Sequence, residues 1–138
     1  MSRPRLLLDP SYAQALLNSR DQWHLRATAL VPRFEGAEVW VTGAVLIELG
    51  DGMAALDREA ASRFIEQALE VPDLRVIAVD EALFRRALDL YESRPDKTWG
   101  LTDCISFVVM CDHGLTAALT ADRHFVQAGF RALLLEEP

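Results

Sequence analysis

The sequence is poor in cysteine, glycine and proline, with 2, 7 and 6 of these among its 138 residues. So little glycine and proline excludes collagen-like and low-complexity chains. Cys104 and Cys111 fall on one predicted helix, about 10 Å apart by helical rise, so they cannot bridge each other. We expect both to be buried, reduced thiols. The longest apolar run, 105–111, falls far short of the roughly 18 residues of a membrane helix. The run 6–8 is too short for a signal-peptide core. We therefore expect a cytoplasmic protein that does not span a membrane.

Positive charge is also scarce, with 14 Lys and Arg against 21 Asp and Glu and a net charge of −7. An acidic chain repels the phosphate backbone, which disfavours a protein that binds nucleic acid by broad electrostatic attraction. It does not disfavour a metal-dependent enzyme, whose site must gather carboxylates. With 51% apolar residues, a chain of this length buries a sufficient core without disulfides. We expect a single domain over residues 1–138.

Hydrophobic periodicity predicts strands that alternate with helices. Strands are expected at residues 5–8, 38–41, 75–79, 117–120 and 131–135. Helices are expected at 10–18, 21–36, 42–52, 58–70, 80–91, 102–113 and 124–128. Asp21 and Thr102 are the expected caps of two of them, Pro32 is expected to kink or stop the second helix, and Gly114 to end the sixth. This order predicts an α/β fold with a central parallel β-sheet of about five strands flanked by helices.

Four acidic residues stand where ligands bind in such a fold. Asp9 directly follows the first strand, Asp122 follows the fourth, and Asp103 opens the helix that leads to the fourth. Glu48 lies on the helix after the second strand and interrupts an apolar stretch, where a buried glutamate is costly without a partner. The carboxyl ends of parallel strands meet at one edge of the sheet, so we expect all four side chains to line one crevice.

Converging carboxylates repel one another unless cations lie among them. Oxygen ligands favour Mg²⁺ or Mn²⁺ over Zn²⁺, because no His or Cys other than His124 stands near these acids in ligand spacing. The matching chemistry is phosphoryl transfer to water, with one ion or a pair of ions lowering the pKa of the attacking water.

Each of these residues also has a structural interpretation. Asp9 is a suitable helix cap, Asp103 is favoured by the helix dipole, Glu48 suits an exposed surface, and Asp122 suits a turn. His124 is a candidate proton donor or metal ligand, but Phe125 beside it favours a packing role.

Candidate contacts with RNA flank the expected crevice. Arg94, Lys97 and Arg123 are either phosphate contacts or solvated surface charges. Trp99 either stacks on an unpaired base or packs beneath its loop.

The sequence resembles the PIN domain family, and within it the VapC-type toxins. The resemblance is strongest in LTDCISFVVMCDHGLTAALTADRHFVQAGF, residues 101–130, and extends to LLLDPSYAQALLN at 6–18 and VTGAVLIELGDG at 41–52. It implies a Mg²⁺- or Mn²⁺-dependent endoribonuclease with Asp9, Glu48, Asp103 and Asp122 as catalytic, metal-binding acids, supported by Ser11 and Thr120. Pro10 departs from the family, where a small or hydroxyl residue is more usual, but it suits the start of a helix.

The resemblance further implies an RNA substrate, a cognate antitoxin protein and a homodimer. Two other functions compete with this one. A haloacid-dehalogenase-like phosphatase also begins with a strand and an aspartate, but it needs a second aspartate where this chain has Ser11. A PIN-fold module that binds RNA or protein without turnover would differ in leaving RNA intact in the presence of Mn²⁺.

Overall fold

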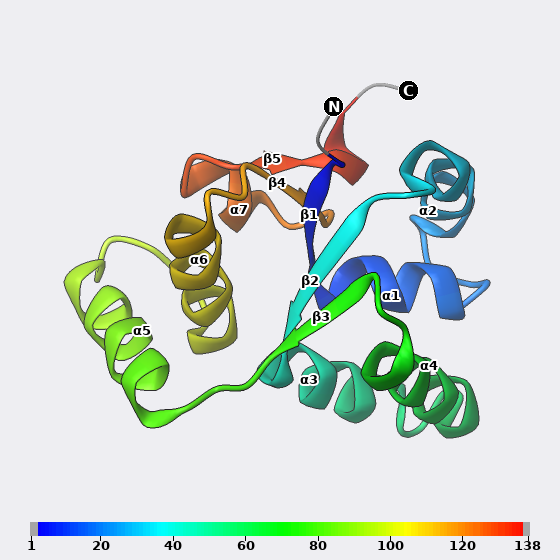
Figure 1. Ribbon diagram of the computed structural model, residues 1–138, viewed down its shortest axis with the longest axis horizontal. Helices are drawn as coiled ribbons and strands as arrows, with labels where there is room; N and C mark the ends of the chain where they lie inside the picture. The colour runs from blue at the N-terminus through cyan, green and yellow to red at the C-terminus, as the bar shows by residue number, and fades with distance from the viewer. Residues whose placement is uncertain (1–2, 137–138) are drawn as a thin grey trace.

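A five-stranded parallel sheet forms the centre of the protein in the computed structural model, which describes residues 3–136 (Figure 1). The strand order is β3-β2-β1-β4-β5, and every pair of neighbours is parallel. The strands are β1 (Arg5–Leu8), β2 (Glu38–Thr42), β3 (Leu74–Ile77), β4 (Ala117–Leu119) and β5 (Arg131–Ala132). The predicted α/β fold is confirmed. The outermost residues of the expected 1–138 domain lie outside the described part of the chain.

The helices cover both faces of the sheet. They are α1 (Pro10–Leu17), α2 (His24–Leu30), α3 (Gly43–Met53), α4 (Arg58–Glu70), α5 (Glu81–Ser93), α6 (Leu101–His113) and α7 (Arg123–Gln127), with short 3₁₀ turns at Val31–Phe34 and Leu133–Leu135. In Figure 1, α1, α2 and α4 lie to the right of the strands, and α5 and α6 to the left. No helix within residues 3–136 is long and apolar enough to cross a membrane.

Side-chain alternation along the strands divides the buried residues between two cores. Leu6 and Leu8 of β1 belong to the core beneath α1 to α4, whereas Leu7 belongs to the core beneath α5 and α6. Val41 and Trp40 of β2 divide in the same way. This is the period of two that a pleated strand imposes, and it explains why strands covered on both faces are apolar almost throughout.

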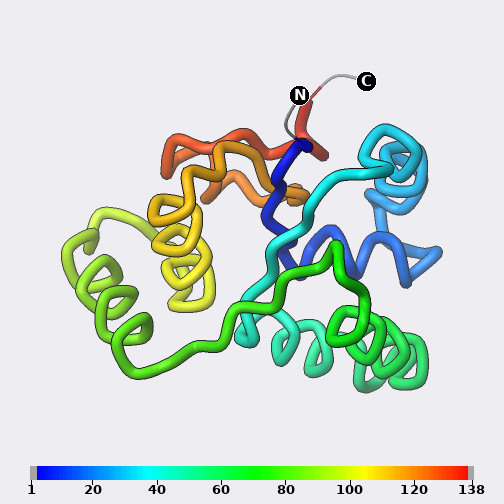
Figure 2. The backbone as a smooth tube through the Cα atoms, in the orientation of Figure 1, coloured from blue at the N-terminus to red at the C-terminus, as the bar shows by residue number. Residues whose placement is uncertain are grey.

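Chain order places a topological switch beside β1. Figure 2 shows the chain leaving β3 through α5 and α6 and returning at β4, on the opposite side of β1. The carboxyl ends of β1 and β4 therefore flank the point where strand order reverses, which is where open α/β sheets bind ligands.

Local capping explains most helix boundaries. The predicted stop at Pro32 is confirmed, because α2 ends at Leu30 and continues only as a 3₁₀ turn. Gly114 ends α6 in the left-handed conformation, with φ of 68°, as predicted. The expected cap at Asp21 is wrong, because its carboxylate accepts from Trp23 N in a turn and α2 begins only at His24.

Three further expectations are wrong at the level of single elements. Thr102 does not cap α6, because the helix begins at Leu101 and Asp103 instead accepts a hydrogen bond from Gly100 N. The last strand is shorter than predicted, because residues after Ala132 turn into a 3₁₀ helix. Cys104 is buried as expected, but Cys111 is exposed on α6.

Candidate metal and catalytic site

Asp9 occupies the end of β1, where the chain leaves the sheet. Its backbone N–H donates to Leu119 O at the end of β4 (3.2 Å), and its side chain caps α1 by accepting from Ser11 N (3.2 Å). The expected capping role and a role in the site are therefore compatible. Only 5% of Asp9 is exposed, which is unusual for a carboxylate and needs polar partners.

Ser11 and Thr120 are those partners. Ser11 Oγ donates to Asp9 Oδ2 at 2.6 Å, and Thr120 Oγ1 donates to the same oxygen at 2.9 Å. Each hydroxyl also accepts from the backbone after β4: Ala121 N donates to Ser11 Oγ (3.1 Å), and Asp122 N donates to Thr120 Oγ1 (2.9 Å). The two hydroxyls thus join Asp9 to the segment that carries Asp122.

The charge state of Asp9 is strongly perturbed. Its pKa is raised from 3.8 to about 7: burial is the largest cause and the charge of Asp103 adds to it, whereas the hydrogen bonds from Ser11 and Thr120 lower the pKa. A carboxyl group held in this way gains from a nearby cation, because the cation offsets both burial and repulsion.

Asp103 and Asp122 approach each other from different elements. Asp103 lies in the first turn of α6, and Asp122 caps α7 by accepting from His124 N (2.8 Å). Burial raises the pKa of Asp103 and the charge of Asp122 raises it further, whereas the hydrogen bond from His124 lowers it. Ligand atoms of Asp103, Asp122 and His124 lie within 4.8 Å of one another, close enough to share one ion.

His124 has a larger part in the site than its sequence context indicated. Its Nδ1 lies 3.0 Å from Asp103 Oδ2 and 3.3 Å from Asp122 Oδ1. Its Nε2 lies 3.2 Å from Thr98 Oγ1. A lone threonine in a polar loop gives no sequence signal, so the sequence does not predict the part of Thr98. The expected packing role holds for Phe125, which is fully buried, whereas the His124 ring contacts the two carboxylates.

Glu48 reaches the site from α3, which contacts α6. The expectation that it is buried in an apolar face is wrong: Glu48 is exposed, and its neighbour Ile47 is 67% exposed. The pKa of Glu48 is nevertheless raised, first by partial desolvation and then by the charges of Asp103 and Asp122. A hydrogen bond from Thr102 lowers it. These mutual effects place all four predicted acids in one electrostatic cluster.

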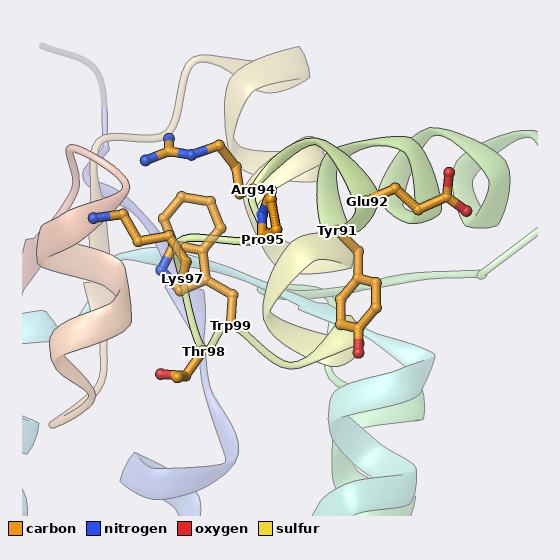
Figure 3. A pocket seen from close by; sticks show the side chains of 7 residues that line it. All are labelled: Tyr91, Glu92, Arg94, Pro95, Lys97, Thr98 and Trp99. Atoms are coloured by element: carbon orange, nitrogen blue, oxygen red, sulfur yellow. The ribbon is translucent and has the colours of Figure 1, made fainter.

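The predicted RNA contacts lie around a loop beside this cluster. Arg94 pairs with Asp96 through two hydrogen bonds of 3.0 Å, Lys97 Nζ lies 4.0 Å from the same carboxylate, and Arg123 is exposed on α7. A cavity of about 410 Å³ adjoins the loop (Figure 3). None of the four acids lines it, and Thr98 joins it to the acidic cluster.

Trp99 is not available as a stacking surface for a base. It is only 6% exposed, its Nε1 donates to Gln127 Oε1 (3.0 Å), and its ring meets Phe107 edge to face at 5.1 Å. Figure 3 shows the Trp99 ring between Arg94 and Lys97, and the Arg94 guanidinium lies 5.1 Å from its centroid. The ring therefore packs beneath the loop.

Comparison with known proteins identifies relatives of this fold. The PIN domain family matches residues 6–131. Among solved structures, VapC20 of Mycobacterium tuberculosis, described as a Sarcin-Ricin loop cleaving toxin, superimposes with a TM-score of 0.82 at 24% identity over 91% of this chain and 95% of that one.

Two further solved structures are similar. FitAB bound to a DNA fragment gives a TM-score of 0.65 at 18% identity, over 96% of this chain and 98% of that one. FitAcB from Neisseria gonorrhoeae gives a TM-score of 0.60 at 20% identity, over 92% of this chain and 94% of that one. Comparison with curated proteins finds no match. At these identities the structural neighbours establish the fold.

Proposed function

The chain belongs to the PIN domain family, and from this premise we propose that it is a Mg²⁺- or Mn²⁺-dependent endoribonuclease. The observation that carries the proposal is the gathering of Asp9, Glu48, Asp103 and Asp122 at the switch point of the sheet. There the charge of Asp103 raises the pKa of Asp9 and of Glu48, and the charge of Asp122 raises the pKa of Asp103. A protein without a cation to bind gains nothing from such repulsion. Residues 1–138 are proposed to act as a single PIN domain.

The donor set fits a hard divalent cation. Asp103 and Asp122 bring ligand oxygens within 4.8 Å of each other, and Asp9 and Glu48 lie near enough for the charge of Asp103 to raise their pKa values. We assign the metal to these four carboxylates, with Ser11 and Thr120 holding Asp9 in place. When bound, the ion would supply charge neutralisation at the scissile phosphate and activation of a water molecule.

The remaining residues of the site orient the substrate. Arg94, Lys97 and Arg123 are proposed phosphate contacts, because they bring positive charge to the rim of an acidic site. With a net charge of −7, the protein is not expected to bind RNA tightly without regard to its shape. A structured stem-loop is therefore the proposed class of substrate.

A protein partner is proposed as well. VapC20 is described as a toxin, and by analogy we propose that this chain is the toxin of a toxin–antitoxin pair in the cytoplasm. Side chains such as Leu25, Ile47 and Leu69 are apolar and largely exposed, which suits contact with an antitoxin or a second copy in a homodimer.

The test is cleavage of structured RNA by the purified protein in Mg²⁺, Mn²⁺ or EDTA, with a stem-loop carrying the Sarcin-Ricin loop sequence among the substrates. Asp103→Asn is the test variant. Asp112→Asn is its matched control, because Asp112 lies at the other end of α6 and pairs with Arg86 on the surface.

We expect wild type and Asp112→Asn to cut in either metal, and Asp103→Asn and every EDTA sample to be inactive. Attack by water also predicts products without 2′,3′-cyclic phosphate ends. Intact RNA in all samples would favour the binding module instead. Cutting that survives EDTA or the Asp103→Asn change would contradict the proposal.

A further inference from the structure

His124 is held on both sides of its imidazole ring. Nδ1 faces Asp103 Oδ2 (3.0 Å) and Asp122 Oδ1 (3.3 Å), and Nε2 faces Thr98 Oγ1 (3.2 Å). The ring thus joins the first turn of α6, the segment after β4 and the loop between α5 and α6. Figure 3 shows Thr98 projecting from that loop on the side away from Arg94.

The chemistry of these partners determines which ring nitrogen carries a proton. An ionised carboxylate only accepts hydrogen bonds, so the nitrogen between Asp103 and Asp122 must donate. A threonine hydroxyl either donates or accepts, so Thr98 satisfies Nε2 in either form. Nδ1 is therefore a donor, and its lone pair is not free to bind a metal.

We propose that His124 is a positioning residue: its Nδ1–H holds the Asp103 and Asp122 carboxylates in register for a shared cation, and Thr98 fixes the ring in that orientation. This inference rests on the proposed function. Proximity alone would make His124 a metal ligand. In the proposed role the histidine instead binds the carboxylates by hydrogen bonding, and the carboxylates bind the metal.

The need for such a residue follows from the construction of the site. Asp103 and Asp122 lie on separate elements, so no backbone hydrogen bond fixes one carboxylate relative to the other, and their charges repel. Asp103 also accepts from Gly100 N (3.2 Å) and Asp122 from His124 N (2.8 Å), which orients each carboxylate on its own element. Within residues 3–136, the His124 ring contacts both carboxylates.

The first test is Mg²⁺ binding to the purified protein by calorimetry, which does not depend on activity. His124→Asn places an amide N–H near the position of Nδ1, whereas His124→Gln places it near Nε2 and His124→Ala has no donor. We expect Mg²⁺ binding to weaken about 10–100-fold in the Ala and Gln variants, as for lost partners of metal ligands, and to be retained in His124→Asn. Thr98→Val should weaken binding and Thr98→Ser should preserve it.

A second test observes the ring directly. Two-dimensional ¹H–¹⁵N spectra of the imidazole should show a protonated Nδ1 on His124 both in EDTA and at saturating Mg²⁺. Loss of the Nδ1 proton on adding Mg²⁺ would overturn the inference and make His124 a ligand. Mg²⁺ binding by His124→Ala as tight as by wild type, or tighter, would also overturn it.

The two proposals fail in different ways. If wild type binds Mg²⁺ and cuts RNA but His124→Ala does both equally well, the positioning role is refuted and the nuclease stands. If wild type binds no Mg²⁺ and cuts no RNA, the proposed function fails, and the role assigned to His124 fails with it, whatever the spectra show.

Discussion

Replacing Asp9 with asparagine is expected to stabilise the metal-free protein while it destroys the proposed metal site. Burial raises the pKa of Asp9 from 3.8 to about 7, with a smaller contribution from the charge of Asp103. Ionising Asp9 is therefore more costly in the folded protein than in the unfolded chain. A tenfold change in proton affinity corresponds to about 1.4 kcal/mol, so the cost above pH 7 is at most roughly 4 kcal/mol.

Asparagine suits this position without rearrangement of its neighbours. The donors from Ser11 and Thr120 converge on a single oxygen of Asp9, Oδ2. The amide oxygen can accept all of these hydrogen bonds, and the amide nitrogen takes the place of the other carboxylate oxygen. Asp9→Asn therefore keeps the hydrogen bonds and removes the buried charge.

The sign of the pH dependence follows from proton linkage. Between pH 3.8 and about 7 the folded wild type binds more protons at Asp9 than the unfolded chain, so this contribution to stability is present below pH 3.8 and is lost as the pH rises to about 7. Asp9→Asn has no such loss. The variant's advantage should be small near pH 4 and reach about 2–4 kcal/mol at pH 8.

The assay is urea unfolding in EDTA across this pH range, followed by the fluorescence of the 3 tryptophans. Asp112→Asn serves as the control, because Arg86 lowers the pKa of Asp112 and loss of that charge should give no stabilisation at pH 8. An Asp9→Asn variant that is less stable than wild type at pH 8, or whose advantage does not change with pH, would refute the reasoning.

Three further stability predictions use the same urea assay at pH 8. Ser106 Oγ is buried without a hydrogen-bond partner among the described residues, so Ser106→Ala should leave stability unchanged or raise it by about 1 kcal/mol; a clear loss would show a missed partner. Gly114 ends α6 at φ of 68°, so Gly114→Ala should cost about 1–2 kcal/mol, and no cost would mean that another conformation is accessible. Thr120→Val removes the hydrogen-bond partner of Asp122 N and of Asp9 and should lower the free energy of unfolding by about 1–3 kcal/mol. Thr120→Ser keeps the hydroxyl and should cost less, and equal losses of stability in both variants would assign the effect to packing.

The sequence was sufficient to predict where the acids lie in the fold. Asp9 and Asp122 follow strands, and in a parallel sheet the order of elements alone brings such positions to one edge. The alternation of strands and helices follows from local signals in the sequence. Examples are the apolar run from Leu6 to Leu8 and the residues that cap the helices. These parts of the fold and the site need no knowledge of side-chain packing.

The remaining features depend on tertiary packing. Whether Glu48 is buried depends on how α3 is rotated against the sheet, and the adjacent apolar Ile47 proved to be exposed too. Trp99 packs beneath its loop because Phe107 and Gln127, from other elements, meet it there. The contact between Thr98 and His124 joins residues 26 positions apart, and no local pattern specifies it.

Whether the four carboxylates form one divalent-cation site is tested most directly by Mn²⁺ titration of wild type, Asp103→Asn and Asp112→Asn, with free Mn²⁺ measured by electron paramagnetic resonance. The site described above predicts the same Mn²⁺ affinity for wild type and Asp112→Asn, and much weaker binding by Asp103→Asn. Equal binding by all three proteins would show that the cation lies elsewhere and would contradict the assignment.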